Sequence, residues 1–399
     1  MGVAEQRLRD AIGKHRAGDH LAAEEGYRAH LREFPEDPSG LHFLGLLRNH
    51  QDRNEEAIQL MLAALERDPD YVDAWSNLGV AYFQLRDYER AEKCARKAID
   101  LAPGFANAWA NLGMTLRARN DVEQALLAWG KALDLQPDMR NIAISYGHLL
   151  YKLNRPAEAL EFYTRWQAAT PDDPIPQHML AAMGGAALPT RASDGYVRAT
   201  FDDFADSFDR NLQDLGYRAP QLLCNAVRES GALAHQEGLQ VLDIGCGTGL
   251  CGPLLRPLAR KLVGVDLSPN MLSKAALRAV YDQLNQAELT EWLGSCEQRF
   301  DLAVAADVLC YFGDVSLAFA RAREVLKPGG CFACSLEALA EAATEKYTLQ
   351  SHGRYQHNLR YVEAMLKDAG LRVVTLTQGV LRHERQDAVA GHLVVAVRV

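Results

Sequence analysis

Residues 241–250 read VLDIGCGTGL, and this stretch decides the fold of the second half of the chain. A short apolar run leads directly into glycines at three alternating positions, Gly245, Gly247 and Gly249. Because glycine has no Cβ, a turn built from it lets a ligand approach the backbone closely. We therefore expect a ligand-binding turn at the end of a buried strand.

Short strand-like runs alternate with helical stretches from residue 239 to residue 399. The alternation predicts a doubly wound, Rossmann-like α/β sheet whose apolar strands are covered by helices on both faces. Ligands of such sheets lie at the carboxyl ends of the strands, near the point where the strand order reverses. The seven expected strands are 240–244, 262–266, 284–288, 301–306, 330–336, 371–377 and 392–399, and the expected helices are 252–259, 270–280, 315–326 and 357–369.

The second expected strand ends on Asp266, in VGVDLSPNML, where a carboxylate can accept hydrogen bonds from ribose hydroxyls. Dinucleotide-binding enzymes also combine a glycine turn with a later acid, but a pyrophosphate site has the spacing G-x-G-x-x-G at a helix N-terminus. Here the spacing is G-x-G-x-G, and Asp243 stands before it as a charge that would repel pyrophosphate. A ribose-containing ligand with a cationic amino-acid part fits better, and S-adenosylmethionine is such a ligand.

Residues 196–399 resemble the class I S-adenosylmethionine-dependent methyltransferases. The resemblance rests on VLDIGCGTG, VGVDLSPNML, AELTEWL, FDLAVAADVLCYFGD and VLKPGGCFACSLE, which occur in the order and at the spacing of that family. It implies a seven-stranded methyltransferase domain with S-adenosyl-L-methionine as its cofactor. Methyl transfer needs the nucleophile, the methyl group and the sulfur in line and away from water, so a catalytic base is optional.

The resemblance also implies which residues surround the cofactor. The glycines would face its methionyl and ribose parts, Asp243 would orient the turn or bind the amino group through water, and Asp266 would hold the ribose. Two apolar side chains would pack on the adenine, Glu288 would accept from its amino group, and Leu289 would offer its backbone amide. The full expected set is Asp243, Gly245, Gly247, Gly249, Asp266, Leu267, Met271, Glu288, Leu289, Asp307, Tyr196 and Phe204.

The aromatic residues of a helix expected over 196–208 support a lid. Tyr196, Phe201, Phe204 and Phe208 recur at helical spacings, and aromatic rings favour a nearby sulfonium cation. We expect this helix to cover the cofactor and shield its sulfur. An ordinary amphipathic helix would have the same pattern, so that alternative stays open.

The acceptor pocket is expected in the segment after the fifth strand, YTLQSHGRYQHNLRYVEAML, residues 347–366. Its arginine and histidines favour an acidic acceptor, or a histidine that accepts a proton; an ordinary polar loop is the alternative. The sequence ADVLCYF after the fourth strand lacks the proline pair of the enzymes that methylate adenine or glutamine nitrogen. The expected substrate-binding residues are Arg354, Tyr355, His357 and Tyr311, and the catalytic candidates are His357, Tyr311 and His352.

The first 173 residues repeat with a period of 34. DAWSNLGVAYFQL at residue 73 recurs as NAWANLGMTLRAR at residue 107, and each unit closes with a proline. Such a unit predicts two helices, in which small residues allow close approach and the proline ends the second helix. The pattern is similar to the tetratricopeptide repeat family, with units 4–37, 38–71, 72–105, 106–139 and 140–173.

Three domains follow from these patterns. Residues 1–173 are expected to form an all-α repeat solenoid, residues 174–195 a capping helix and linker, and residues 196–399 the methyltransferase domain with its helical lid. A similar order, repeats and then a methyltransferase domain, occurs in bacterial predicted methyltransferases that carry tetratricopeptide repeats.

The solenoid is expected to offer a groove to a protein or peptide partner. The family's carboxylate clamp needs Asn at a position that holds Leu46, Val80, Met114 and His148 here, so we exclude that clamp. Asn77 and Asn111 stand where some relatives hold an extended peptide, although Asn is also simply common at this position.

Composition limits the other classes of protein to which the chain could belong. The net charge of −9 argues against a general nucleic-acid binder, and no apolar run is long enough to cross a membrane. Cys331 and Cys334 form a C-x-x-C, but in an apolar run without a second pair, so we expect no metal site. The N-terminal residues lack the apolar core of a signal peptide, and scattered cysteines fit a reducing compartment, so a cytoplasmic location is expected.

Two hypotheses for the whole chain remain. In the first, the chain is an active methyltransferase whose repeats recruit or orient the acceptor, a small acidic metabolite or a peptide or protein side chain. In the second, the repeats form a scaffold and the methyltransferase fold is structural or senses the cofactor. A variant of the first has the repeats mediate only oligomerisation.

Overall fold

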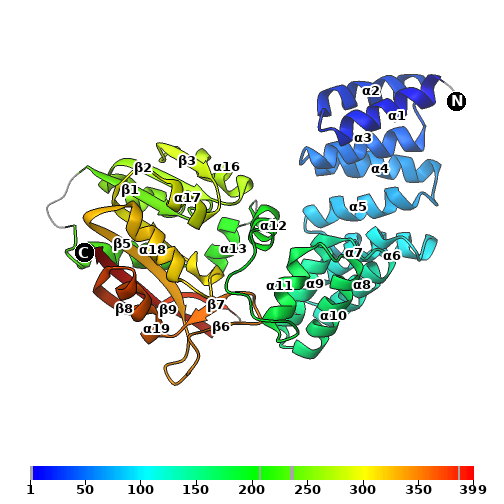
Figure 1. Cartoon of the computed structure of the whole chain (residues 1–399). Helices are drawn as coiled ribbons and strands as arrows, with labels where there is room; N and C mark the ends of the chain where they lie inside the picture. Colours follow the sequence, from blue (N-terminus) through cyan, green and yellow to red (C-terminus); the bar gives the residue numbers. More distant parts are fainter. Residues whose placement is uncertain (1–2, 206–207, 234–237, 385–386) are drawn as a thin grey trace. The chain divides into compact units, whose positions relative to one another are not determined.

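The computed structural model describes residues 3–205, 208–233, 238–384 and 387–399 (Figure 1). The chain divides into two compact units, Met1–Leu150 and Tyr151–Val399. The first unit is helical, and the second contains the sheet together with helices that precede it in the sequence.

Each of the five expected repeats folds into two helices, which confirms the predicted all-α repeat region. The pairs are α1 (Val3–Arg16) and α2 (His20–Glu33), α3 (Pro38–His50) and α4 (Asn54–Arg67), α5 (Val72–Gln84) and α6 (Tyr88–Leu101), α7 (Ala106–Ala118) and α8 (Val122–Leu135), and α9 (Arg140–Lys152) and α10 (Pro156–Ala169). The division between the compact units falls inside α9, so α10 belongs to the second unit.

The 34-residue period also appears in the backbone. The turn between the two helices of each pair holds one residue at positive φ: Gly18, Asp52, Arg86, Asn120 and Asn154. A left-handed residue ends a helix and reverses the chain. In three of the pairs, the aspartate that follows accepts from the backbone of the next helix and caps it: Asp19, Asp87 and Asp121.

Glycine in the first helix of a repeat allows the second helix to pack against it. A Cβ at Gly113 would overlap the indole ring of Trp129, which is almost completely buried and donates from Nε1 to the carbonyl of Ala110 at 3.1 Å. The repeat pattern therefore has a packing cause: one helix supplies the gap and the other fills it.

Four helices lie between the repeats and the sheet. They are α11 (Pro174–Ala182), α12 (Asp194–Phe204), α13 (Phe208–Asp214) and α14 (Ala219–Glu229). Helix α11 lies where a capping helix was expected, and its capping role stays a prediction. The single helix expected over 196–208 is instead two helices, α12 and α13.

The second unit contains a nine-stranded sheet. Its strands are β1 (Leu239–Ile244), β2 (Ala259–Asp266), β3 (Gln283–Gln286), β4 (Phe300–Ala305), β5 (Leu326–Ala338), β6 (Tyr347–Leu349), β7 (Tyr355–His357), β8 (Leu371–Glu384) and β9 (Asp387–Arg398). The helices between them are α15 (Gly252–Leu255), α16 (Pro269–Leu277), α17 (Leu289–Ser295), α18 (Ser316–Val325) and α19 (Leu359–Asp368), with short 3-10 turns η1 (Arg256–Leu258) and η2 (Leu309–Tyr311).

The strand order is β3-β2-β1-β4-β5, all parallel, and β9 and β8 continue it in antiparallel fashion. The order reverses between β1 and β4, which places the glycine turn after β1 at the switch point of the sheet. The doubly wound fold predicted from the sequence is therefore confirmed, and all seven expected strands are present.

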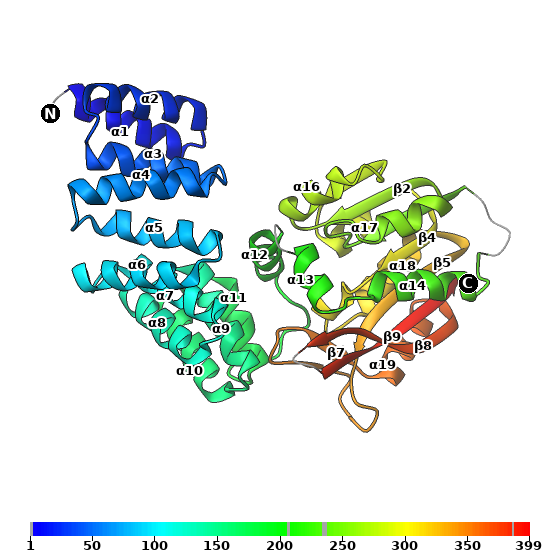
Figure 2. The same cartoon turned by 180° about the vertical axis from the view of Figure 1, so that it is seen from behind.

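Helices cover both faces of the sheet (Figure 2). On one face, Leu293, Phe319 and Leu366 from α17, α18 and α19 join one apolar core. On the other face, Leu223 and Leu255 from α14 and α15 join a second core. Cys331 and Cys334 lie on opposite faces of β5, one in each core.

Two features differ from the sequence prediction. Residues 347–357 form an antiparallel hairpin, β6 and β7, where a polar loop was the expected alternative, and β7 extends the sheet beside β5. The C-terminal strands β8 and β9 are longer than expected and pair from Leu371 to Glu384. Among the residues that the structure describes, no helix has the length and apolar character needed to cross a bilayer.

Candidate functional site

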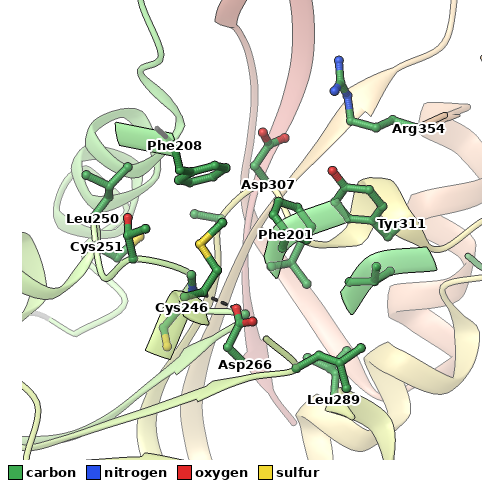
Figure 3. A pocket seen from close by; sticks show the side chains of 18 of the residues that line it. Phe201, Phe208, Cys246, Leu250, Cys251, Asp266, Leu289, Asp307, Tyr311 and Arg354 are labelled. Atoms are coloured by element: carbon green, nitrogen blue, oxygen red, sulfur yellow. Dashed lines mark hydrogen bonds between the residues drawn. The ribbon is translucent and has the colours of Figure 1, made fainter. Parts of the chain in front are cut away.

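The glycine turn sits at the floor of a cavity in the second unit (Figure 3). Gly245, Gly247 and Gly249 all have positive φ, between 53° and 84°. A Cβ at Gly245 would overlap the side chain of Val308, whereas a Cβ at Gly247 would meet no atom within 4 Å. The turn is thus packed on one side and open to the cavity at Gly247.

Asp266 at the end of β2 is joined directly to this turn. Its Oδ2 accepts from the backbone N–H of Gly247 at 2.8 Å, and its Oδ1 accepts from the backbone N–H of Ser268 at 2.9 Å. The side chain lines the cavity. These bonds fix the orientation of the carboxylate without using all of its lone pairs.

Asp243 lies beneath the turn and not in the cavity lining. It is almost fully buried, and the hydroxyl of Tyr281 donates to its Oδ2 at 2.6 Å. Burial raises the pKa of Asp243 to about 7, and the bond from Tyr281 only partly opposes this. Its hydrogen bond with Tyr281 does not run into the cavity, and both of its expected roles stay predictions.

Two aspartates fasten the helices α12 and α13 to the loops of the sheet. Asp202 of α12 accepts from the hydroxyl of Ser268 at 2.5 Å, and Asp209 of α13 accepts from the hydroxyl of Thr248 at 2.5 Å. Arg278 also donates to Asp209 and, at 2.6 Å, to the carbonyl of Thr248. Both helices are therefore held beside the glycine turn and Asp266.

Phe201 and Phe208 of these helices line the cavity together with Tyr311. The ring of Phe201 makes edge contacts with the rings of Phe208, at 5.9 Å between centroids, and Tyr311, at 5.4 Å. Figure 3 shows the three rings around the same space.

The two aromatics expected here, Tyr196 and Phe204, do not line the cavity. Helical periodicity turns Tyr196 to the opposite side of α12, where its ring stacks on His178 at 3.8 Å between centroids. The division of the expected helix into α12 and α13 brings Phe208 into the cavity instead.

The residues expected around the adenine all line the cavity: Leu267, Met271, Glu288 and Leu289. Glu288, however, caps α17, because its Oε2 accepts from the backbone N–H of Glu291 at 2.8 Å and from the hydroxyl of Thr290 at 2.7 Å. Its Oε1 lies 3.6 Å from Nη1 of Arg191, which is also paired with Asp194. Glu288 follows β3 and is not part of it.

A buried ionic network contributes Asp307, Arg354, Arg382 and Glu384 to the lining of the cavity. Arg382 donates from Nη1 to Asp307 at 3.0 Å, from Nε to Glu384 at 2.7 Å and from Nη2 to Glu337. Arg354 donates from Nε to Glu337 at 2.7 Å and from Nη2 to Glu384. Two guanidinium groups therefore face three carboxylates.

The network fixes the charge of its members. Burial alone would raise the pKa of Glu337, but the guanidinium groups of Arg354 and Arg382 outweigh it and lower this pKa to about 2. All three carboxylates of the network accept hydrogen bonds from arginine. Asp307 also holds a positive φ of 57° and lines the cavity.

The candidate acceptor residues divide into two groups. Arg354 and Tyr311 line the cavity, as expected, but Arg354 is already paired with two carboxylates. His352, Tyr355 and His357 do not line it.

His357 is fully buried in β7, where its Nε2 lies 2.7 Å from the carbonyl oxygen of Phe312, and burial lowers its pKa to about 4. Burial, followed by the charge of Arg354, likewise lowers the pKa of His352 to about 4. The hydroxyl of Tyr355 donates to the carbonyl of Pro189 at 2.8 Å. Period-two alternation in β7 turns Tyr355 and His357 into the interior, whereas His352 lies in the turn between β6 and β7.

The sequence prediction missed Arg382, Glu384 and Glu337. The first two stand in GVLRHERQ, which looks like a polar loop between two strands, and mutual pairing is what allows these charges to be buried. Cavity residues Arg191 and Ala192 were also missed, since they lie in the expected linker.

The two groove candidates of the repeats contact neighbouring helices. Nδ2 of Asn77 lies 2.9 Å from Nε2 of His42, and Nδ2 of Asn111 donates to the hydroxyl of Ser76 at 2.9 Å. In both cases the partner lies in the preceding repeat, so each amide joins two repeats.

Comparison with protein families finds two kinds of match along the chain. Residues 242–332 match the family described as "Methyltransferase domain". Tetratricopeptide repeat families match residues 72–105, 110–174 and 45–86.

Curated relatives are similar to part of the chain. Ubiquinone biosynthesis O-methyltransferases of Cereibacter sphaeroides and Brucella melitensis are each 32% identical, over 124 and 147 residues, which is 30% and 36% of this chain and 50% and 56% of the relatives. An enzyme of the same name from Chelativorans sp. is 34% identical over 29% of this chain and 47% of its own length. The chain therefore spans about half the length of the curated relatives it matches.

Solved structures resemble each half. Magnesium protoporphyrin IX methyltransferase from Synechocystis PCC 6803, with bound S-adenosylhomocysteine, is 18% identical, with a TM-score of 0.41 over 52% of this chain and all of its own. A thermophilic tetratricopeptide repeat protein from Thermus thermophilus is 22% identical, with a TM-score of 0.39 over 45% of this chain and 98% of its own.

The family matches coincide with the helix pairs and with the core of the doubly wound sheet, including the glycine turn. The chain therefore contains a segment that matches the methyltransferase-domain family and, before it in the sequence, segments that match tetratricopeptide repeat families.

Proposed function

We propose that the cavity is the site of an S-adenosylmethionine-dependent methyltransferase whose acceptor is recruited or oriented by the repeats. The observation that carries the proposal is the bond from Gly247 N–H to Asp266, because it places an oriented carboxylate beside open backbone at the switch point of the sheet. This arrangement suits a ribose and an amino-acid part on one ligand.

The residues present fit that cofactor. Asp266 accepts two backbone bonds and retains lone pairs for ribose hydroxyls, and the open side of Gly247 leaves room for the ligand. The described residues that line the cavity include five carboxylates and three arginines. This excess of acidic side chains favours a cationic ligand. When bound, S-adenosylmethionine would supply the methyl group.

The chain's own contribution is binding, orientation and exclusion of water. Asp266 would hold the ribose, and Leu267, Met271 and Leu289 would form the apolar wall for the adenine. Phe201, Phe208 and Tyr311 would enclose the sulfonium with aromatic surface, which attracts a cation and keeps water away.

We further propose that the acceptor presents a hydroxyl or an amine and not a carboxylate. Arg354, together with two histidines, was the reason to expect an acidic acceptor, but Arg354 and Arg382 are already paired with Asp307, Glu337 and Glu384. Asp307 faces the cavity and can accept a hydrogen bond from an acceptor O–H or N–H. The names of the curated relatives, O-methyltransferases, favour the hydroxyl.

One experiment tests activity and acceptor class together. The full chain is incubated with methyl-labelled S-adenosylmethionine and a bacterial lysate, and protein is separated from small molecules. We expect label with the wild-type chain and none with Asp266→Ala. A portion is then treated with mild base, which releases methanol from methyl esters but leaves methyl ethers and methylamines intact. Release of the label as methanol would contradict the proposed acceptor class.

The alternative function, a repeat scaffold with a structural or cofactor-sensing domain, makes a different prediction. The scaffold function requires that the domain binds the cofactor, or only keeps its fold, while neither the protein fraction nor the small-molecule fraction becomes labelled. The complete cavity, with Asp266, the open glycine turn and three aromatic rings, favours the enzyme.

A further inference from the structure

Helix α11, which follows the last repeat, contacts both the lid and the acceptor side of the cavity. It belongs to the same compact unit as the sheet, because that unit begins at Tyr151. The contacts converge on His178, a side chain that is 5% exposed and that no part of the proposed reaction uses.

His178 contacts the lid through Tyr196. The imidazole ring stacks on the Tyr196 ring with 3.8 Å between centroids and 27° between planes. Tyr196 lies on α12, about one and a half turns before Phe201, whose ring lines the cavity. The stack therefore fixes the helix that carries Phe201.

His178 also contacts the turn of the β6–β7 hairpin. Its Nε2 lies 2.9 Å from the carbonyl oxygen of Gly353, the residue before Arg354. Since a carbonyl can only accept, Nε2 carries the proton and donates. Burial lowers the pKa of His178, so the neutral imidazole with its proton on Nε2 meets this requirement.

The turn is shaped to fit this contact. Gly353 has a φ of +84°, and a Cβ there would lie 2.5 Å from the hydroxyl of Tyr196 and 3.2 Å from the sulfur of Met179. Behind it, Ala181 of α11 packs with Leu349 and Tyr355 of the hairpin in a small apolar core. Helix, lid and turn thus meet at one point with no room for an added methyl group.

We propose that His178 is a positioning residue of the methyl-transfer site, which joins the helix after the repeats to the lid that carries Phe201 and to the turn that carries Arg354. The inference rests on the proposed function. It means that α11, which does not line the cavity itself, holds two segments that do.

The test is a double-mutant cycle in the full chain, read by the affinity for S-adenosylmethionine in calorimetry. His178→Ala is expected to weaken binding about tenfold, within the range of coupling between contacting residues. If His178 acts through the lid, its effect is lost once the Phe201 ring is absent. The double variant His178→Ala/Phe201→Ala should then bind the cofactor no more weakly than Phe201→Ala alone. Additive losses, or no loss for His178→Ala, would overturn the proposal.

Conservative variants and a matched control separate positioning from general stability. His178→Gln keeps an N–H donor and should restore part of the affinity, whereas His178→Phe keeps only the ring. His30→Ala removes a histidine of equal burial from the repeats and should leave the affinity unchanged. A loss of affinity for His30→Ala equal to that for His178→Ala would also contradict the proposal.

Hydrogen exchange gives a readout that does not depend on the cofactor. His178→Ala should increase amide exchange in residues 194–204 and 347–357, while His30→Ala should not. If the wild-type chain bound no S-adenosylmethionine, the proposed function would fail, and the exchange pattern would still test the contact. Unchanged exchange in both segments would refute the positioning role.

Discussion

The backbone N–H of Gly247 donates to Asp266 Oδ2 across 2.8 Å, and this bond connects the turn after β1 to the end of β2. It joins the two motifs that first suggested a ligand, VLDIGCGTGL and VGVDLSPNML. The carboxylate is held in place before any ligand arrives, so binding does not have to order it.

The two glycines that flank Cys246 should respond differently to alanine. At Gly245, positive φ and overlap with Val308 together should cost about 3 kcal/mol of unfolding free energy. At Gly247 the added methyl group meets no protein atom, so the cost should be only the left-handed strain of about 1 kcal/mol. Thermal unfolding of the two variants measures the difference.

Gly247→Ala has a second expected effect. Its Cβ would project into the cavity, so it should weaken binding of S-adenosylmethionine although the fold is intact. The contradicting outcome for Gly245 is an unfolding temperature of Gly245→Ala equal to that of the wild-type chain. It would show that Gly245 does not lie against the side chain of Val308.

Asp243 should make the stability of the domain depend on pH. Burial raises its pKa in the folded chain to about 7, above the ordinary value of 3.8. A raised pKa means that the folded state binds the proton more tightly, so this stability is fully present below about pH 4 and is lost as pH rises through about 7. Between about pH 5 and pH 8 the loss should be about 2–3 kcal/mol.

The comparison variant is Asp243→Asn, which cannot ionise. The wild-type unfolding temperature should fall relative to that of the variant from about pH 5 to pH 8. If the unfolding temperatures of the wild-type chain and Asp243→Asn differed by the same amount at every pH in that range, Asp243 would not be a buried group that titrates there.

Arg382 should be the most sensitive member of the ionic network. It is 2% exposed and pairs with three carboxylates, so Arg382→Met leaves Asp307 without its arginine and leaves Glu337 and Glu384 with Arg354 alone. The expected loss is about 3–5 kcal/mol of unfolding free energy. Arg360→Met, at an exposed arginine on α19, should change the stability by less than about 0.5 kcal/mol. Equal effects of the two substitutions on urea unfolding would contradict the network.

Much of the architecture could be predicted because period and spacing are local properties of the sequence. The 34-residue period located every helix pair, and the positive φ at Asp52, Arg86 and Asn120 recurs with the same period. Apolar runs located the seven main strands, and the G-x-G-x-G turn with Asp266 located the cavity.

The acceptor side could not be predicted in the same way. Arg354, His352 and His357 are close in sequence and suggested one polar pocket, yet only Arg354 lines the cavity. Their surroundings depend on β8, which supplies Arg382 and Glu384 from a distant part of the chain. Tyr355 and His357 stand two residues apart in the sequence, the spacing of one face of a strand, whereas the pairing of charges across the sheet leaves no local pattern.

The most direct test of the account is the affinity of the full chain for S-adenosylmethionine, measured by calorimetry with the wild-type protein, Asp266→Ala and Asp368→Ala. Asp368 is an exposed acid on α19 and serves as the matched control. We predict that the wild-type chain and Asp368→Ala bind equally, and that Asp266→Ala binds at least about a hundredfold more weakly, as loss of two charge-assisted hydrogen bonds requires. Absence of binding to the wild-type chain, or equal affinity of Asp266→Ala, would contradict the account.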